Sequence, residues 1–214
     1  MPIGEYDRRL EILTAEAGRI SAFARGARRP SSNLAAPARA FAFGQFELFQ
    51  GKSSYSLEKA DISHYFNELT RDVELTYYGF YFLEVSRYFS RENIPASEEL
   101  GLLYYSLRAL SLDSLDNRLV RAVFEIKMLD INGLCPPPER LEAAEGRFAF
   151  AKDFQSGTMY AIRFVIESPV KKLYTFRLSD SVLKEFAAAA AELMGMSTDR
   201  KFKSLEFLQN EQYE

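Results

Sequence analysis

The sequence has few residues that bind metals or form disulfides, since its 214 residues include one cysteine and one histidine. It also has no tryptophan. A single thiol, Cys135, excludes an internal disulfide and any zinc or iron–sulfur site held by several cysteines. No apolar run approaches the roughly 18 residues that a membrane-spanning helix requires. The charged residues 1–9 are followed by no apolar segment that could serve as a secretory signal. We therefore expect a cytoplasmic protein with no metal, no cofactor and no membrane contact.

Catalytic motifs are equally scarce. Ser181 and Lys184 have a Ser-x-x-Lys spacing, but the partner motifs of the acyl-transfer enzymes that use it are missing. His64 stands alone, and a lone histidine is more often a packed residue than a catalytic base. The sequence contains no glycine-rich phosphate loop. We expect a protein that is not an enzyme; the alternative is a metal-dependent nuclease built on a carboxylate pair such as Glu5 and Asp7.

Charge is distributed unevenly along the chain. The formal net charge is −3, yet residues 1–56 contain eight basic and five acidic residues. Five arginines and no acidic residue lie between Ala17 and Phe46. This pattern predicts a positive surface that faces a polyanion such as nucleic acid. The alternative, a basic surface that only aids solubility, stays open at this point.

Residues 1–60 have the pattern of short strands. Alternating residues at 10–14 and 20–24 flank a turn at Ala17–Gly18 and predict a hairpin. Residues 25–33 are mostly polar and predict an exposed loop. A strand is predicted at 41–49, and a turn at 50–52 connects it to a further strand. This succession favours a small barrel of the OB type, which binds single strands through charge and stacking. The alternating aromatic residues of the strand at 41–49 fit either the core or a base-stacking platform; they are Phe41, Phe43 and Phe49.

After residue 60 the spacing of apolar residues becomes helical. Spacings of three to five from Phe66 to Tyr88 predict a long amphipathic helix, and further helices are predicted from Ser97 and over about 116–131. Strands are predicted again over about 147–178, followed by an alanine-rich helix after Ser179. The predicted fold class is α+β. It comprises an OB-fold-like β-barrel over 1–60 and a mainly helical domain over 61–214 with a small β insertion.

Three N-terminal segments have a distinctive pattern: residues 4–14, Gly18-Arg19-Ile20, and the loop Ala24-Arg25-Gly26-Ala27-Arg28-Arg29-Pro30-Ser31-Ser32. These segments resemble the RecO family of bacterial recombination mediators. Residues 46–49, 64–91 and 203–208 are also similar to the family. The resemblance implies an N-terminal OB-fold and a helical C-terminal domain.

The same resemblance implies a function in DNA repair and recombination. Members of the family bind single-stranded and duplex DNA, anneal complementary strands, and work with RecR and the single-strand binding protein to load recombinase. The alternative is an interaction scaffold that binds RecR or the single-strand binding protein with little DNA binding of its own. The residues that we expect to contact phosphates are Arg8, Arg9, Arg19, Arg25, Arg28, Arg29 and Lys52.

Two departures from the family bear on these expectations. Many members bind a zinc ion through four cysteines after the third helix, where this chain has only Cys135. We therefore expect no zinc, and we expect a small hydrophobic sheet to stabilise this region in place of the metal. The family also has a strand before the Gly4–Glu5 turn, and Met1–Ile3 leaves almost none of it. We expect the neighbouring strand to present an exposed edge that is prone to pair with another chain.

Overall fold

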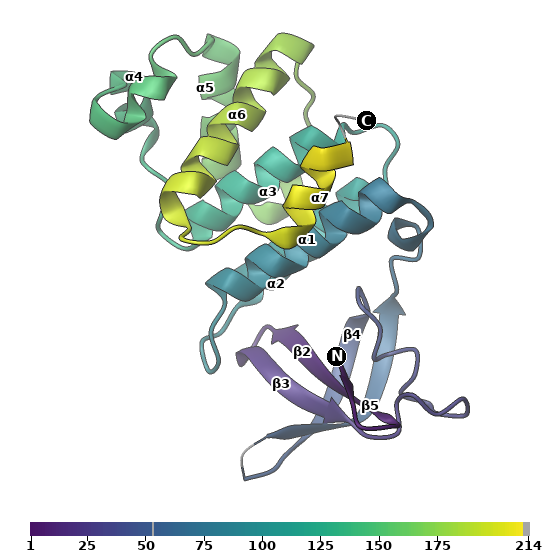
Figure 1. The fold of residues 1–214 in the computed structure, drawn as a ribbon. Coiled ribbons are helices and arrows are strands. Elements are labelled where there is room, and N and C mark those ends of the chain that lie inside the picture. Colours follow the sequence, from purple (N-terminus) through teal and green to yellow (C-terminus); the bar gives the residue numbers. More distant parts are fainter. Residues whose placement is uncertain (53, 212–214) are drawn as a thin grey trace.

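The computed structural model describes residues 1–52 and 54–211 and consists of a sheet followed by a helical body (Figure 1). The strands are β1 (Pro2–Ile3), β2 (Asp7–Thr14), β3 (Gly18–Ala24), β4 (Phe43–Gln50) and β5 (Tyr55–His64). The α-helices are α1 (Val73–Phe89), α2 (Ser97–Leu110), α3 (Asn117–Ile131), α4 (Pro138–Ala143), α5 (Ser156–Glu167), α6 (Asp180–Ser197) and α7 (Lys203–Glu211). Short 3₁₀ helices are η1 (Leu69–Arg71), η2 (Gly146–Ala151) and η3 (Val170–Lys172).

The five strands form one sheet in the order β1-β2-β3-β5-β4. The pairs are antiparallel except for β3 and β5, which run parallel over a short stretch. This arrangement matches a partly open OB-fold, so the predicted OB-like sheet and the α+β class are confirmed. The last strand continues to His64, beyond residue 60.

The predicted hairpin is present and its register follows the hydrophobic alternation. Strand β2 pairs with β3 from Arg8 opposite Ala24 to Thr14 opposite Gly18. Along β3 the alternate residues Ile20 and Ala22 are buried, while those between them are half-exposed. Because successive side chains of a strand point to opposite faces, this alternation fixes which face of the hairpin looks toward solvent.

The main core lies in the helical body around α3, which packs against α1, α2, α5 and α6. Almost every side chain of α3 from Leu119 to Leu129 is buried. Phe82 of α1 stacks on Phe124 of α3, with ring centroids 4.2 Å apart. α3 is therefore buried on nearly all sides at the centre of the helical body, even though it carries the buried charged residues Glu125 and Lys127.

The prediction of strands over about 147–178 is wrong, because this segment forms η2, α5 and η3. The β-branched and aromatic residues between Tyr160 and Ile166 favoured a strand locally. In the structure Ala161, Ile162 and Val165 are buried on one side of α5, which packs against α3 and α6. Burial at helical spacing has therefore overridden the intrinsic strand preference of these residues. The small sheet expected in place of a zinc site is absent from this described segment.

The sheet is fastened to the helical body at the β2–β3 turn. Gly18 has a φ of +64°, and a Cβ placed on it would lie 2.1 Å from the carbonyl oxygen of Arg91 and 2.3 Å from that of Ile94. Backbone hydrogen bonds surround this contact: the Arg19 N–H donates to the Arg91 oxygen at 3.1 Å, and the Asn93 N–H donates to the Ala17 oxygen at 2.9 Å. The turn thus lies directly on the segment that joins α1 to α2.

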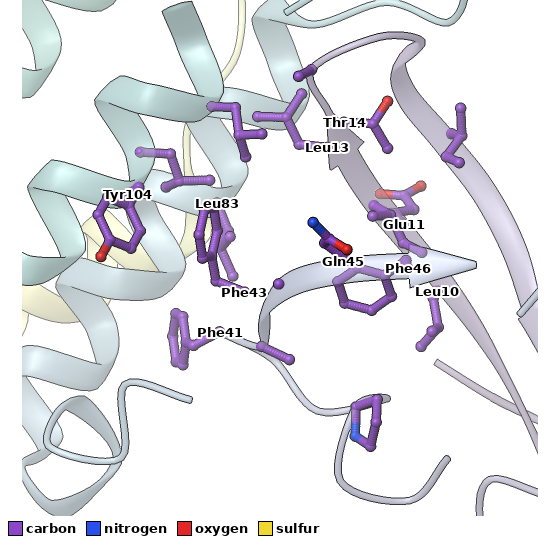
Figure 2. A pocket seen from close by; sticks show the side chains of 18 of the residues that line it. Leu10, Glu11, Leu13, Thr14, Phe41, Phe43, Gln45, Phe46, Leu83 and Tyr104 are labelled. Carbon is purple, nitrogen blue, oxygen red and sulfur yellow. The ribbon is translucent and has the colours of Figure 1, made fainter. Parts of the chain in front are cut away.

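A second contact between sheet and helices is aromatic. The ring of Phe41 lies against Gly79 of α1, where a Cβ would come within 2.9 Å of the ring. Phe43 packs on Tyr104 of α2, with ring centroids 4.5 Å apart (Figure 2). Phe49, by contrast, is 64% exposed. These three aromatic residues could have been either core residues or a platform for base stacking. Phe41 and Phe43 pack between the sheet and the helices, whereas Phe49 is exposed and available for another contact.

Replacing Gly18 by alanine is expected to destabilise the protein by about 3 kcal/mol or more. The new side chain costs about 1–2 kcal/mol for its left-handed backbone, and the two carbonyls must also move. Gly133→Ala is the matched control, because Gly133 has a φ of +69° and open space around it. This variant should lose only the stability that the left-handed backbone costs, about 1–2 kcal/mol. Denaturant unfolding of both variants measures the difference, and equal losses would show that the close contact contributes nothing.

Candidate nucleic-acid interface

The loop after β3 presents three exposed arginines, Arg25, Arg28 and Arg29. Its backbone is anchored to the start of β2, since the Gly26 N–H donates to Asp7 Oδ1 at 2.7 Å and the Arg28 N–H donates to the Tyr6 oxygen at 2.9 Å. These hydrogen bonds fix the base of the loop and leave its guanidinium groups at the surface.

Tyr6 supports one of these arginines. The guanidinium carbon of Arg29 lies 5.1 Å from the centre of the Tyr6 ring, and the Arg28 Nη1 donates to the Gly4 oxygen at 3.2 Å. A cation over an aromatic face is held in place while its charge stays available to an anion. The turn before β2 and the loop after β3 therefore form one arginine-bearing end of the hairpin. We call the loop itself the arginine loop (residues 25–29).

A second group of basic residues lies on the outer face of the sheet. The Arg9 Nε donates to Ser21 Oγ at 2.7 Å, and Arg19 lies on the same face of β3 as Ser21. A hollow of about 570 Å³ is lined by Arg9 and Lys52 and includes Phe23, which is paired with Arg9 and shares this face. Two cations and an aromatic ring at one hollow are groups that can hold a phosphate and stack a base.

Arg8 differs from the other predicted contacts because its side chain is turned into the structure. Its Nη1 donates to the Ala38 oxygen at 2.9 Å, and its Nε is buried with no hydrogen-bond partner in the described part of the chain. Arg8 thereby ties β2 to the segment that leads into β4. We exclude it from the phosphate-binding set for that reason.

Two carboxylates near the basic surface make contacts within the fold, while Glu92 lies at the hollow and forms no ion pair among the described residues. Glu11 pairs with Arg87 of α1, with Nε 2.7 Å from Oε2, and Asp7 caps the arginine loop. Within residues 1–52 and 54–211, none of the seven predicted contact residues has a carboxylate within ion-pair distance. Their charge is thus uncompensated at short range, as an anion-binding surface requires.

The side chains considered for catalysis do not converge on a site. Asp7 Oδ1 accepts from the Gly26 N–H, and the His64 ring lies among the aromatic rings of Phe66 and Tyr104. The Ser181 Oγ lies 3.4 Å from Ser179 Oγ. Across the described residues, no three His, Cys, Asp or Glu side chains are grouped so that they could hold a metal ion, and a single cysteine does not fit a four-cysteine zinc site.

A buried carboxylate links two helices of the body. Glu125 of α3 is 1% exposed and accepts hydrogen bonds from the Tyr81 hydroxyl and, at 2.8 Å, from Arg121 Nε. Burial, together with the neighbouring Glu125 carboxylate, raises the pKa of Tyr81 well above its usual value. Tyr81 therefore stays protonated and donates to Glu125, which links α1 to α3.

Two family models together match most of the chain. Recombination protein O N terminal covers residues 1–66, and Recombination protein O C terminal covers residues 70–140. The chain belongs to the RecO family. No helix in the described residues is long and apolar enough to cross a membrane.

Individual relatives named DNA repair protein RecO match over much of the chain. The protein from Acetivibrio thermocellus is 28% identical over 96% of this chain and 90% of its own length. The protein from Symbiobacterium thermophilum is 25% identical over 95% of this chain and 90% of its own length. The protein from Alkaliphilus metalliredigens is 32% identical over 62% of this chain and 54% of its own length.

Sequence reasoning missed the aromatic members of this RecO surface. Tyr6 is the only aromatic residue in the turn before β2, and that isolation beside an arginine-rich loop is a weak signal that could have drawn attention to it. Phe23 lies beside Arg9 because the two residues are paired across β2 and β3, and Lys52 reaches the same hollow from the β4–β5 turn. Glu92 and Asn93 reach the same hollow from the α1–α2 connection.

The cysteine of this RecO protein is expected to be unreactive in the native state. Burial raises the pKa of the Cys135 thiol to about 12, so the thiolate that attacks alkylating reagents is scarce at pH 8. Iodoacetamide should modify the native protein at least about a hundredfold more slowly than the protein in urea. Equal rates in the two conditions would contradict the buried position of this thiol.

Proposed function

We propose that this RecO protein is a recombination mediator in DNA repair, which binds DNA and promotes annealing without making or breaking covalent bonds. The observation that supports this function is the set of exposed basic side chains without carboxylate partners on one module. The proposed contacts are Arg9, Arg19, Arg25, Arg28, Arg29 and Lys52. The relatives named DNA repair protein RecO support the same role.

The proposed mode of binding follows from the chemistry of the two basic groups. The arginine loop contacts phosphates, and the hollow near Arg9 and Lys52 holds a further phosphate while a base stacks on Phe23. Contacts to the backbone carry no sequence information, so sequence preference is weak. Duplex DNA offers the same phosphates and binds to the same residues through charge alone.

Annealing follows from charge neutralisation on this surface. Two single strands repel each other because each carries one negative charge per nucleotide. A surface that binds phosphates of both strands lowers this repulsion and raises the local concentration of each strand. The protein thereby speeds pairing without a catalytic group.

The helical body is the proposed site of protein contacts. Residues 65–214 contain 18 basic and 23 acidic residues, so this part of the chain repels DNA and leaves the sheet module to bind it. We propose that the body binds RecR and the single-strand binding protein during loading of recombinase. We also propose that the protein works in the cytoplasm, at the nucleoid during repair.

Changing Arg25, Arg28 and Arg29 together to alanine should weaken binding of labelled single-stranded DNA. Each lost phosphate contact flattens the slope of log affinity against log salt by about 0.7, so three contacts remove about two units. Fluorescence anisotropy at several salt concentrations measures both quantities. An unchanged affinity and slope would remove the arginine loop from the binding site.

A matched control carries the same change of charge on the other domain. Lys171, Lys172 and Arg177 are exposed and lie on or beside η3 of the helical body, and their triple change to alanine should leave the slope as it is. If both triple variants bind DNA more weakly by the same factor, the loss of affinity comes from the change in net charge and not from the arginine loop. Binding of a labelled oligonucleotide by the unmodified protein separates a DNA-binding mediator from a protein scaffold, because the scaffold would bind RecR but little DNA. The arginine-loop variant should still co-elute with purified RecR, since the proposed RecR contact lies on the helical body.

A further inference from the structure

Phe49 of β4 is 64% exposed, whereas aromatic side chains usually bury most of their surface. It lies opposite Ser56 of β5, and Ser56 in turn lies opposite Phe23 of β3. Arg9 of β2 is the partner of Phe23 on the other side. Because residues paired across strands point to the same face of a sheet, these four residues form one row across it. We call them the outer row.

The burial of neighbouring residues shows that the outer row faces away from the core of the sheet. Ala22 and Leu57 are buried, and each directly precedes or follows a member of the row. Since successive side chains of a strand point to opposite faces, the row lies on the face turned to solvent. The two phenylalanines agree with this, because Phe23 is only half-buried and Phe49 is exposed.

Ser56 leaves a gap between the two phenylalanine rings. Neighbouring strands of a sheet lie about 4.8 Å apart, so β3 and β4, on either side of β5, lie about 10 Å apart. Two bases stacked between two aromatic rings need three spacings of about 3.4 Å, which also add to about 10 Å. A serine side chain is too short to fill this gap. The space above Ser56 therefore has the width of a stack of two bases.

The two sides of the outer row differ in charge. The hollow that contains Arg9 and Lys52 is also lined by Ser54, two residues before the serine of the row, so it lies on one side. Its two cations outnumber its one carboxylate, Glu92. Glu58, two residues after that serine, is exposed on the other side. A sugar–phosphate backbone is therefore attracted to the hollow and repelled by Glu58. A strand that lies in the hollow can direct its bases over the row.

We propose that Phe23 and Phe49 bind two adjacent bases of a single DNA strand as a stack above Ser56, while the phosphates of these nucleotides lie in the hollow. This inference rests on the DNA binding proposed above and adds a contact that only an unpaired strand can make. The bases of a duplex are stacked and paired within the double helix, so duplex DNA binds through charge without entering the row. Stacking tolerates any sequence, because every base has an aromatic face.

The first test uses the full chain, which contains no tryptophan. Phe49→Trp places a single indole in the outer row, and Tyr160→Trp is the matched control at a position of α5 that is 72% exposed. Saturating single-stranded DNA should quench the first tryptophan, because a base stacks on it, and should leave the second unchanged. A duplex of the same sequence and an abasic oligonucleotide of the same length should quench neither.

The second test measures affinity by fluorescence anisotropy. Phe49→Ala should bind single-stranded DNA about tenfold more weakly, since it loses one stacked base. Its affinity for duplex and abasic DNA should stay the same. Its slope of log affinity against log salt should also stay the same, because stacking releases no condensed counterion. Phe49→Tyr keeps an aromatic ring and should bind like the unmodified protein.

The size of the slot is tested with abasic oligonucleotides that carry two adenines. Two adjacent adenines should bind about fivefold more tightly than two adenines separated by one abasic sugar, because only the adjacent pair stacks without a gap. Both oligonucleotides have the same phosphates and the same bases. Equal affinities would contradict a slot for two stacked bases.

Three further results would overturn the stacking contact. They are equal quenching of the two tryptophans, equal quenching by single-stranded and duplex DNA, and an unchanged single-strand affinity of Phe49→Ala. In each of these cases the protein still binds DNA, so the proposed function would stand without the slot. A protein that binds none of the oligonucleotides would overturn both.

Discussion

The close contact between the β2–β3 turn and the α1–α2 connection fixes the geometry of the whole molecule. Gly18 lies so near the Arg91 and Ile94 carbonyls that no side chain fits between them, and Phe41 and Phe43 add an aromatic contact on α1 and α2. The hairpin that carries Arg9 and Arg19 thus keeps one orientation relative to the helical body. A partner bound to the body would meet DNA bound to the sheet at a fixed angle.

Two carboxylates beside the basic surface are engaged by contacts within the fold. Glu11 forms an ion pair with Arg87 of α1, and Asp7 accepts a hydrogen bond from the Gly26 N–H at the base of the arginine loop. The same carboxylates that could neutralise the arginines instead hold the fold that presents them. Such a division lets a chain with a net charge of −3 carry a surface for polyanions.

Much of this architecture could be predicted from the sequence because it rests on local patterns. The hairpin around Gly18, the exposed loop after Ala24 and the helix ending before Pro95 follow from alternation, turn residues and helical spacing. The strands expected near Tyr160 failed because packing of α5 on α3, a long-range contact, decided the conformation.

The candidate site was predictable only in part, for the same physical reason. The arginines of the loop are exposed because nothing apolar surrounds them, which composition reveals. The inward turn of Arg8 toward the Ala38 carbonyl depends on a segment 30 residues away, and the place of Lys52 beside Arg9 in one hollow depends on the pairing of β3 with β5. Sequence patterns identify which charges exist, whereas the tertiary fold decides which of them face the solvent.

The central claim is that several cations of the sheet module replace condensed counterions on a DNA strand. The salt dependence of single-strand binding by the unmodified protein tests it most directly. Six phosphate contacts predict a slope of log affinity against log salt near about −4. A slope close to zero, with binding that persists in high salt, would contradict the account.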